Sequence, residues 1–471
     1  DNDGNIFISA PTLWNIVTFK YDSNGNELWA ASYADDENSR GRPNAITSDD
    51  YGNVYIAGCF SSLGKRSDYL IIKYNAIGAE QWVAKYDGTV HSFDVANAIA
   101  VDESGNVYIT GSSTNSNTGK DYATIKYSAD GVQQWLVCYN GTGDSQDQAY
   151  DIAVSQFGNI FVTGNSGTIK YNGEGAFQWI DSTMIASKII VDEMENCYGT
   201  GKNTAKINSD GNVEWIASIT GNGRSIAVDD SGYVYVAGST TREGQGSNIT
   251  TTKLDFDGNI VWFAEYNGPI NSTDIATALS IDDYGNIYVT GNSGSYTGYD
   301  FATIKYDPCG EEQWVARYDS TGFYDETAAI AVDDLGNVYV AGTSYEMVIY
   351  DLYWSVVTTI KYSQTSTSIE QEMNIVPRTF YLSQNYPNPF NPTTTIRYAL
   401  PKDSYVTLKV FNLLGQELAT LVDEMKLMGE HRIPWQAVNL PSGVYLYQLE
   451  ANSNDGSLFY FNETKKFILL K

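Results

Sequence analysis

Short runs of alternating apolar and polar residues cover most of the chain and are separated by clusters of Gly, Asn and Asp. At residues 98–111, for example, Ala-Ile-Ala-Val-Asp is followed by Glu-Ser and then by Gly-Asn-Val-Tyr-Ile-Thr-Gly. A period of two residues is typical of a half-buried β-strand, and Gly, Asn and Asp favour tight turns because they tolerate positive φ. The 3.6-residue period of a helical array is absent. The pattern therefore predicts an all-β chain of short antiparallel strands.

The strand pattern recurs as an internal repeat with four strand-like runs in each unit. The spacing between copies is 53 residues from Lys73 to Lys126 and shrinks to 36 residues from Lys170 to Lys206. Four strands per unit at such a period are typical of a β-propeller blade. We expect the recurring Trp of each unit to pack between blades. The Lys recurs at Lys20, Lys73, Lys126, Lys170, Lys206, Lys253, Lys305 and Lys361, and the Trp at Trp29, Trp82, Trp135, Trp179, Trp215, Trp262 and Trp314.

The number of repeats sets the expected number of blades. Eight units contain the second and third runs, the first unit lacks its opening run, and the last lacks the Trp run. We therefore expect a β-propeller of seven to eight four-stranded blades over residues 1–363, with eight favoured and the terminal blades incomplete. Because the chain begins at Asp1, inside a repeat, we expect it to be a fragment or a processed product.

The repeated segments resemble a known family. Gly-Asn-Val-Tyr-Ile-Thr-Gly at 105–111 and Thr-Ile-Lys-Tyr at 124–127 are similar to segments of the bacterial secreted β-propeller repeat family and, more distantly, to NHL repeats. The resemblance covers about residues 1–363. It implies the propeller fold, but no particular activity, because members of that family share no common chemistry.

A second domain follows a polar linker. Residues 364–378, which begin Gln-Thr-Ser-Thr-Ser, break the repeat and are expected to form the linker. Residues 379–471 contain several strand-like runs and are expected to form a small Ig-like β-sandwich. The runs are 394–400, 405–412, 417–422, 432–435, 443–451 and 465–470.

The motifs of this second domain resemble the C-terminal sorting domain of type IX secretion cargo. They include Asn-Tyr-Pro-Asn-Pro-Phe-Asn-Pro at 385–392, Val-Phe-Asn-Leu-Leu-Gly-Gln at 410–416 and Leu-Pro-Ser-Gly-Val-Tyr at 440–445. The resemblance implies the type IX secretion machinery as the partner of 379–471, and a secreted or outer-cell-surface location. The motif residues are Asn385, Pro387, Asn388, Pro389, Phe390, Asn391, Pro392, Gly415, His431, Gly443, Tyr445 and Lys471.

The charge of the chain excludes several classes of partner. The formal charge is −29, and all of this excess lies in residues 1–378, because eight basic and eight acidic residues cancel in 379–471. Such a charge argues against a nucleic-acid groove and against an anionic membrane surface. No apolar run approaches the roughly 18 residues of a membrane span. An acid excess instead fits an extracellular protein kept soluble by self-repulsion.

The sequence offers little material for catalysis or metal binding. His91 and His431 are the only histidines, which excludes multi-His metal sites. The cysteines lack paired spacing and are expected to be isolated thiols. The repeated Asp-x-x-Gly-Asn segments lack the Glu and helices of an EF-hand and are expected to be hairpin turns. We expect no cofactor, with Ca²⁺ as the alternative. The cysteines are Cys59, Cys138, Cys197 and Cys309.

Loop topology gives the strongest candidate site. If each blade runs from its inner to its outer strand, the long loops share one face of the disc, the long-loop face, where binding residues commonly lie. Aspartates recur there before the inner strand and before the third strand. We expect them to bind Ca²⁺ or a cationic or polyhydroxyl ligand, or else to cap backbone N–H groups. The aspartates are Asp94, Asp147, Asp274, Asp325, Asp68, Asp121 and Asp300, and the loops are 112–120, 140–148, 239–248, 292–299 and 343–354.

Three functions fit these observations. The favoured hypothesis is a non-catalytic module that binds a glycan or a surface protein through the long-loop face. The first alternative is a carboxylate-dependent hydrolase or lyase at the channel mouth, for which Asp147 and Asp325 would have to approach within about 5–10 Å. The second alternative is a structural or adhesion component of the cell surface.

Overall fold

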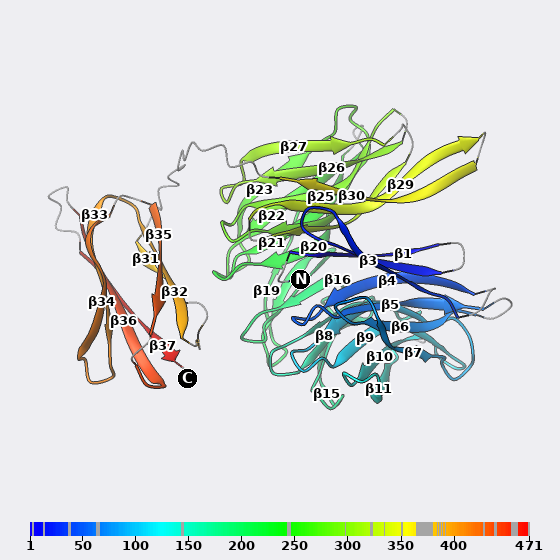
Figure 1. The fold of residues 1–471 in the computed structure, drawn as a ribbon, viewed down its shortest axis with the longest axis horizontal. Helices are drawn as coiled ribbons and strands as arrows, with labels where there is room; N and C mark the ends of the chain where they lie inside the picture. Colours follow the sequence, from blue (N-terminus) through cyan, green and yellow to red (C-terminus); the bar gives the residue numbers. More distant parts are fainter. Residues whose placement is uncertain are drawn as a thin grey trace. The chain divides into compact units, whose positions relative to one another are not determined.

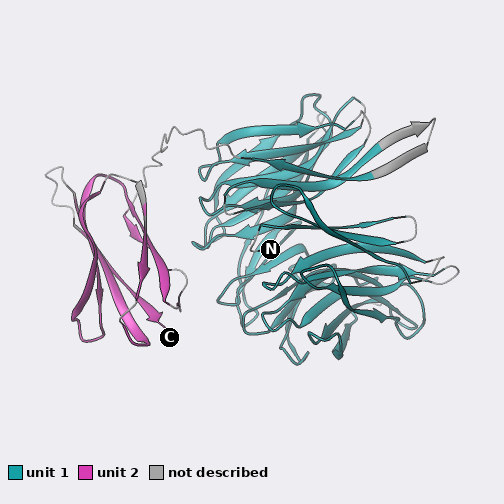
Figure 2. Cartoon of the chain, viewed as in Figure 1, with its two compact units in different colours: residues 1–364 teal, residues 365–471 magenta. Residues whose placement is uncertain are grey.

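The computed structural model forms two compact units, Asp1–Gln364 (unit 1) and Thr365–Lys471 (unit 2), shown in Figure 2. Among the described residues no helix is long and apolar enough to cross a membrane. The linker expected at 364–378 lies outside the described residues. The structure describes residues 1–471 except 2–3, 13–14, 36–38, 63–65, 143–145, 243–245, 297, 321–323, 334, 350–351, 364–379, 384, 386–387, 389, 391, 427–428, 438–439, 454–459 and 470–471.

Unit 1 contains eight antiparallel sheets that follow one another in chain order (Figure 1). The first and last sheets have three strands and the other six have four. The first three sheets are β1 (Ile6–Pro11), β2 (Ile16–Tyr21) and β3 (Glu27–Tyr33); β4 (Arg40–Ser48), β5 (Val54–Ser61), β6 (Asp68–Tyr74) and β7 (Glu80–Tyr86); and β8 (Val95–Val101), β9 (Val107–Asn115), β10 (Gly119–Tyr127) and β11 (Gln133–Tyr139).

The remaining five sheets repeat the same antiparallel order, and the fold class expected from the sequence is confirmed. They are β12 (Ala149–Val154), β13 (Ile160–Gly164), β14 (Gly167–Tyr171) and β15 (Phe177–Asp181); β16 (Ala186–Val191), β17 (Cys197–Gly201), β18 (Thr204–Ile207) and β19 (Val213–Ala217); β20 (Asn222–Val228), β21 (Val234–Arg242), β22 (Gly246–Leu254) and β23 (Ile260–Tyr266); β24 (Asp274–Ile281), β25 (Ile287–Gly294), β26 (Tyr299–Tyr306) and β27 (Glu312–Tyr318); and β28 (Asp325–Val332), β29 (Val338–Ile349) and β30 (Leu352–Tyr362).

Tight turns join the first two strands of each blade. In the turn at Asp102, Oδ1 accepts the N–H groups of Ser104 and Asn106, and Oδ2 accepts the side chains of Asn106 and Tyr108 at 2.8 and 2.9 Å. The Asp-x-x-Gly-Asn segments are therefore hairpin turns, as expected, because both carboxylate oxygens are used within the turn. The same contacts recur at Asp49, Asp192, Asp282 and Asp333.

The repeated Trp and Lys join each blade to the next. Trp82 Nε1 and Lys73 Nζ both donate to Ala129 O, at 2.9 and 3.1 Å, in the turn between β10 and β11 of the following blade. Gly131 of that turn has φ of 80°, and a Cβ there would lie 2.7 Å from the Trp82 ring. The turn therefore requires Gly both for its backbone and for the indole that covers it. Packing of the Trp between blades is confirmed, and it recurs at Trp29, Trp135, Trp179, Trp215 and Trp262.

The last sheet contacts the first in the same way. Lys361 Nζ, on β30, donates to Ser23 O at 2.6 Å, and Tyr339 OH donates to the same carbonyl at 3.3 Å. Ser23 lies in the turn between β2 and β3, which corresponds to the turn of Ala129. The eight sheets therefore close into a ring, as the favoured count of eight blades predicts.

Three of the five expected long loops are largely strand, and in 112–120 β9 pairs with β10 as far as Asn115 and Gly119. The segment 239–248 forms a hairpin in which β21 pairs with β22 as far as Arg242 and Gly246, and in 343–354 the pairing of β29 with β30 continues to Ile349 and Leu352. The loops at these positions are therefore shorter than expected, because the backbone pairing of the second and third strands continues into them.

Unit 2 is a sandwich of two antiparallel sheets. One has the order β31-β32-β35 and the other β34-β33-β36-β37, and Phe467, Leu449 and Ile396 lie buried in its core. The strands are β31 (Tyr381–Leu382), β32 (Thr393–Leu400), β33 (Ser404–Phe411), β34 (Glu417–Lys426), β35 (Gly429–Gln436), β36 (Gly443–Ser453) and β37 (Tyr460–Leu469).

Candidate functional site

The four aspartates expected before the inner strands are buried and bind the loops that join the blades. Each accepts one backbone N–H through Oδ2, and the donor is the first or second residue of the preceding loop. This is the capping geometry that the sequence analysis gives as the alternative to ligand binding. The donors are Gly88 N to Asp94 at 2.8 Å, Gly141 N to Asp147 at 2.8 Å, Gly268 N to Asp274 at 2.7 Å and Ser320 N to Asp325 at 2.9 Å.

The second oxygen of each of these carboxylates is also used. Ser293 Oγ donates to Asp274 Oδ1 at 2.5 Å, and a Cβ on Gly268 would lie 2.5 Å from that hydroxyl and 2.8 Å from that carboxylate oxygen. A Gly six residues before the Asp is thus the sequence signal of the cap. Elsewhere the donors to Oδ1 are Thr114 N for Asp94, Ser166 Oγ for Asp147 and Ser320 Oγ for Asp325.

The aspartates that precede the third strands are less fully paired. Asp300 Oδ2 accepts Arg317 Nη2 at 2.6 Å, and Asp121 Oδ2 accepts the side chains of Asn115 and Thr118, both at 2.7 Å. The Oδ1 atoms of Asp121 and Asp300 are buried and have no hydrogen-bond partner among the described residues. A buried carboxylate oxygen without a donor is costly, so these atoms are the unsatisfied feature of the predicted set.

Two groups of carboxylates come together where blades meet. In each group, one ligand atom of every member lies within 4.8 Å of the others. The structure thus brings Asp68 together with Asp94, and Asp300 with Asp325, at two separate junctions. The sequence analysis did not identify Asp87 and Asp319, which complete the groups. The available signal was their shared position directly after the Tyr that ends an outer strand. The groups are Asp68, Asp87 and Asp94, and Asp300, Asp319 and Asp325.

His91 belongs to the first of these junctions. Its φ is 49°, and its Nδ1 lies 2.5 Å from Asp87 Oδ2. The hydrogen bond to Asp87, the charge of Asp87 and the more distant charges of Asp68 and Asp94 raise the pKa of His91. Asn271, with the same φ of 49°, occupies the equivalent turn of another junction, so the turn itself does not require His.

The first strands of the blades contact one another in order around the centre of unit 1. Seven of them, β4, β8, β12, β16, β20, β24 and β28, carry a β-bulge in their pairing with the second strand. A bulge leaves one residue outside the ladder and re-aims its side chain. The residues at these seven bulges are Asn44, Asn97, Tyr150, Ser187, Arg224, Thr277 and Ala328.

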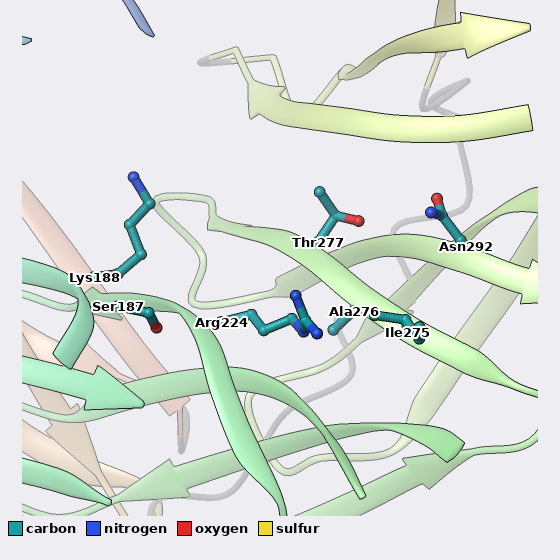
Figure 3. A pocket seen from close by; sticks show the side chains of 7 residues that line it. All are labelled: Ser187, Lys188, Arg224, Ile275, Ala276, Thr277 and Asn292. Carbon is teal, nitrogen blue, oxygen red and sulfur yellow. The ribbon is translucent and has the colours of Figure 1, made fainter. Parts of the chain in front are cut away.

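A solvent-open hollow of about 450 Å³, the central pocket, lies against three of these strands. Figure 3 shows Arg224 extending from β20 toward Ala276 on β24, while the side chain of Lys188, on β16, points away from Arg224. The pocket is near the start of the first strands, where the interblade loops join them, and so opens on the long-loop face. It is lined by Ser187, Lys188, Arg224, Ile275, Ala276, Thr277 and Asn292.

An adjoining hollow of about 280 Å³ shares Ser187 and Arg224 with the central pocket and adds the exposed Tyr150. Neither hollow was predicted from the sequence. The available signal was Arg224, a basic residue at a position where most other repeats carry a short polar residue. This signal appears only when the repeats are aligned across their bulges.

The charges of the central pocket are unevenly balanced. Lys188 Nζ lies 3.2 Å from Asp151 Oδ1, while its side chain remains 51% exposed. Burial raises the pKa of Asp151, although Lys188 and the N–H of Ile189 oppose that shift. Among the described residues Arg224 has no ion pair. The pocket therefore offers one free guanidinium and one half-exposed ammonium.

The sorting-domain motif builds one edge of unit 2. Phe390 is buried between Trp435 and Phe467, at ring distances of 6.0 and 5.4 Å, and its N–H donates to Ile468 O. Asn388 Oδ1 accepts the N–H of Ile468 at 2.7 Å. The motif is therefore a structural clamp on the last strand.

The other motif residues also have structural contacts. Asn385 Nδ2 donates to Thr394 Oγ1, the Tyr445 ring stacks on Phe467, His431 stacks on Tyr398, and Gly415 has φ of 78° in a turn. Gly443 begins β36 and Pro392 directly precedes β32. Pro387, Pro389, Asn391 and Lys471 lie outside the described residues.

Comparisons with known proteins identify relatives of both units. The Beta-propeller repeat model matches residues 91–117, 139–168, 216–242 and 313–346, and the Secretion system C-terminal sorting domain model matches 384–459. Regulatory protein FlaEY of Caulobacter vibrioides is 26% identical over 259 residues, 48% of this chain and 26% of that protein. The match thus spans about a quarter of that relative.

Some solved structures are similar to this chain at low sequence identity. BamB from Moraxella catarrhalis is 12% identical with a TM-score of 0.41, over 73% of this chain and 94% of that one. A polysaccharide lyase, PL25 ulvan lyase, is 11% identical with a TM-score of 0.42, over 73% of this chain and 88% of that one. At these values neither structure bears on activity. The repeat matches fall in unit 1 and the sorting-domain match falls in unit 2, so the chain carries β-propeller repeats followed by a type IX secretion C-terminal sorting domain, which indicates secretion.

Proposed function

We propose that this exported propeller is a non-catalytic module that binds a glycan on the long-loop face, at the central pocket. The observation that carries the proposal is the pocket itself, a solvent-open hollow whose lining combines the polar residues Ser187, Thr277 and Asn292 with Lys188 and Arg224. Rigid β scaffolds commonly bind ligands where a few polar groups converge in a hollow of this size.

The pairing of the predicted aspartates supports binding over catalysis. Acid–base hydrolysis needs two carboxyl groups that can exchange protons with a substrate. Asp94, Asp147, Asp274 and Asp325 already accept hydrogen bonds at both oxygens from the loops or blades around them. Carboxylates engaged in this way serve the structure of the junction.

A glycan array probed with the full chain, together with a pull-down from cell-surface extracts, tests the proposal. We expect at least one glycan to bind, and to bind less well after Asn292→Ala than after Asn24→Ala, an exposed position in the turn between β2 and β3. If a protein binds and no glycan does, the ligand is a protein and not a glycan. Loss of cell attachment when the protein is deleted would favour the structural or adhesion role.

A carboxylate-dependent hydrolase or lyase is the second candidate, because the groups at Asp68 and Asp300 bring carboxylates within 4.8 Å of one another. That separation is close to what paired-carboxylate chemistry requires. Incubation of the chain with polysaccharides should then release reducing ends or unsaturated products, and Asp319→Asn should abolish the release. If the chain binds polysaccharides but releases no product from any of them, the hydrolase or lyase candidate is contradicted.

A Ca²⁺ ion at the Asp300, Asp319 and Asp325 group is a further part of the proposal. Ca²⁺ prefers carboxylate oxygens, and the partnerless Asp300 Oδ1 supports a cation there, although Arg317 already offsets one charge. Ca²⁺ should raise the melting temperature of the chain, and the rise should be smaller for Asp319→Asn. An unchanged melting temperature in Ca²⁺ and in a chelator refutes the site.

A further inference from the structure

We propose that the ligand of the central pocket is an acidic polysaccharide, whose carboxylate or sulfate groups bind Arg224 and Lys188 and whose sugar ring stacks on Tyr150. This inference rests on the proposed glycan-binding function and names the class of glycan.

The bulge positions show which side chains the fold itself needs. In most blades the bulge residue is short and polar and bonds the first strand of the next blade. Asn97 Nδ2, for example, donates to Ala149 O at 2.7 Å, and Ser187 Oγ donates to Gly223 O at 3.0 Å. Such a contact joins neighbouring inner strands, so it explains a short polar residue at this position. The same role is filled at Asn44, with Ala96 O, and at Thr277, with Thr327 Oγ1.

Three bulge residues, Tyr150, Arg224 and Ala328, depart from this rule, and two of them, Tyr150 and Arg224, have long side chains. Both occupy bulge positions, yet neither has a hydrogen bond to the next blade among the described residues, and Tyr150 is 38% exposed. Both line the same adjoining hollow. Two of the three positions at which the bulge residue lacks this bond among the described residues therefore place an aromatic ring and a guanidinium along the same hollow.

The chemistry of this pair selects an anionic sugar. A guanidinium binds carboxylate or sulfate groups through paired N–H donors, and a phenol ring stacks on the apolar face of a sugar. Lys188 adds a second cation at the edge of the central pocket, where Asp151 offsets only part of its charge. The chain has a formal charge of −29, so Arg224, which has no ion pair among the described residues, gives the centre of the disc a local positive charge. This positive charge would attract an anion.

The shape of the site favours a polymer over a small anion. The two hollows of about 450 and 280 Å³ meet at Ser187 and Arg224 and are open to solvent. An open, elongated surface of this kind accommodates successive residues of a chain, whereas a single small anion is usually held in an enclosed site.

Binding of the full chain to matched polysaccharides tests the inference. Dextran, carboxymethyl-dextran and dextran sulfate share one backbone and differ in charge, and polygalacturonate supplies a natural uronate. We expect the acidic polymers to bind more tightly than dextran, and the affinity to fall as salt is added. Arg224→Gln should weaken binding at least tenfold, since it removes a charge-assisted hydrogen bond. Tyr150→Ala should weaken binding by about the same factor, since it removes a stacking surface.

Arg242→Gln is the matched control. Arg242 is exposed at the end of β21, on the same face, where it pairs with Glu265, so the substitution makes the same charge change outside the pocket. It should alter affinity less than about twofold. Because Arg224 and Tyr150 make no structural hydrogen bond among the described residues, the melting temperatures of both pocket variants should match that of the wild type.

The outcomes separate the two proposals. Binding of neutral glycans alone, unaffected by Arg224→Gln, overturns the acidic-ligand inference and leaves the glycan-binding function standing. Equal losses with Arg224→Gln and Arg242→Gln show a diffuse charge effect and overturn the pocket. Failure of every neutral and acidic glycan overturns both proposals.

Discussion

Replacement of Asp274 by Ala tests whether the recurring aspartates hold the blades together. Asp274 is fully buried and accepts two hydrogen bonds, from Gly268 N at 2.7 Å and from Ser293 Oγ at 2.5 Å. Ser293 Oγ is in turn 2.5 Å from Nη1 of Arg317, so the carboxylate ends a short polar chain at the junction between two blades.

The expected loss of stability follows from these contacts. Removal of the carboxylate leaves the buried Gly268 N–H without an acceptor and takes away a second charge-assisted bond. Such losses together cost about 2–4 kcal/mol in the free energy of unfolding. Asp274→Asn should cost less, because its amide oxygen can still accept the Gly268 N–H.

Chemical denaturation and hydrogen exchange measure the effect at two levels. The unfolding midpoint should fall in the order wild type, Asp274→Asn, Asp274→Ala. Exchange of the Gly268 N–H should accelerate in Asp274→Ala, because that amide then opens to water without breaking a bond. Asp257→Ala, at an exposed turn, is the matched control and should leave both readings unchanged.

The cap interpretation would be refuted by an Asp274→Ala variant that unfolds at the wild-type midpoint with unchanged Gly268 exchange. A rise in the unfolding midpoint of Asp274→Ala would refute the cap interpretation more strongly. It would mean that the carboxylate is destabilising in the unliganded protein and is kept for a ligand.

Three further predictions concern other parts of the chain. Lys361→Met should lower the melting temperature and speed hydrogen exchange near Ser23, because it removes a bond that closes the ring; unchanged exchange there would show that closure does not depend on it. The pKa of His91, measured by NMR with His431 as the second signal, should lie above its ordinary value and should fall in Asp87→Asn. The contribution of the His91–Asp87 pair to stability is therefore full below the unfolded-state pKa and is lost as the pH rises through the folded-state pKa. Equal His91 pKa values in the wild type and in Asp87→Asn would exclude the pairing. Phe390→Ala should destabilise unit 2 by about 3–5 kcal/mol and reduce the exported amount of the chain, while normal export of a destabilised variant would separate sorting from folding.

Local pattern explains why the fold was predictable. The period of two residues, the Asp-x-x-Gly-Asn turns and the recurring Trp each act within one unit or between adjacent units, so a single repeat contains the information for a blade and its neighbour contact. Eight copies then predict eight sheets. The extension of β21 and β29 beyond the blade was missed because these segments differ from unit to unit and carry no repeated pattern.

The candidate site was only partly predictable, for a different reason. The recurring aspartates were visible as repeats, but their role depends on atoms from the next blade. Asp87 and Asp319 join the carboxylate groups only because strand ends from two blades meet there.

The sequence by itself determined the strands, the repeated blades and the export domain, since each rests on residues close together in the chain. Tertiary structure decided what the centre of the disc presents. A bulge in each of the seven first strands leaves one residue outside the ladder, and only the packing of three consecutive blades brings Tyr150, Lys188 and Arg224 to two adjoining hollows. That juxtaposition depends on strand register and blade packing, and neither can be read from the order of residues along a single repeat.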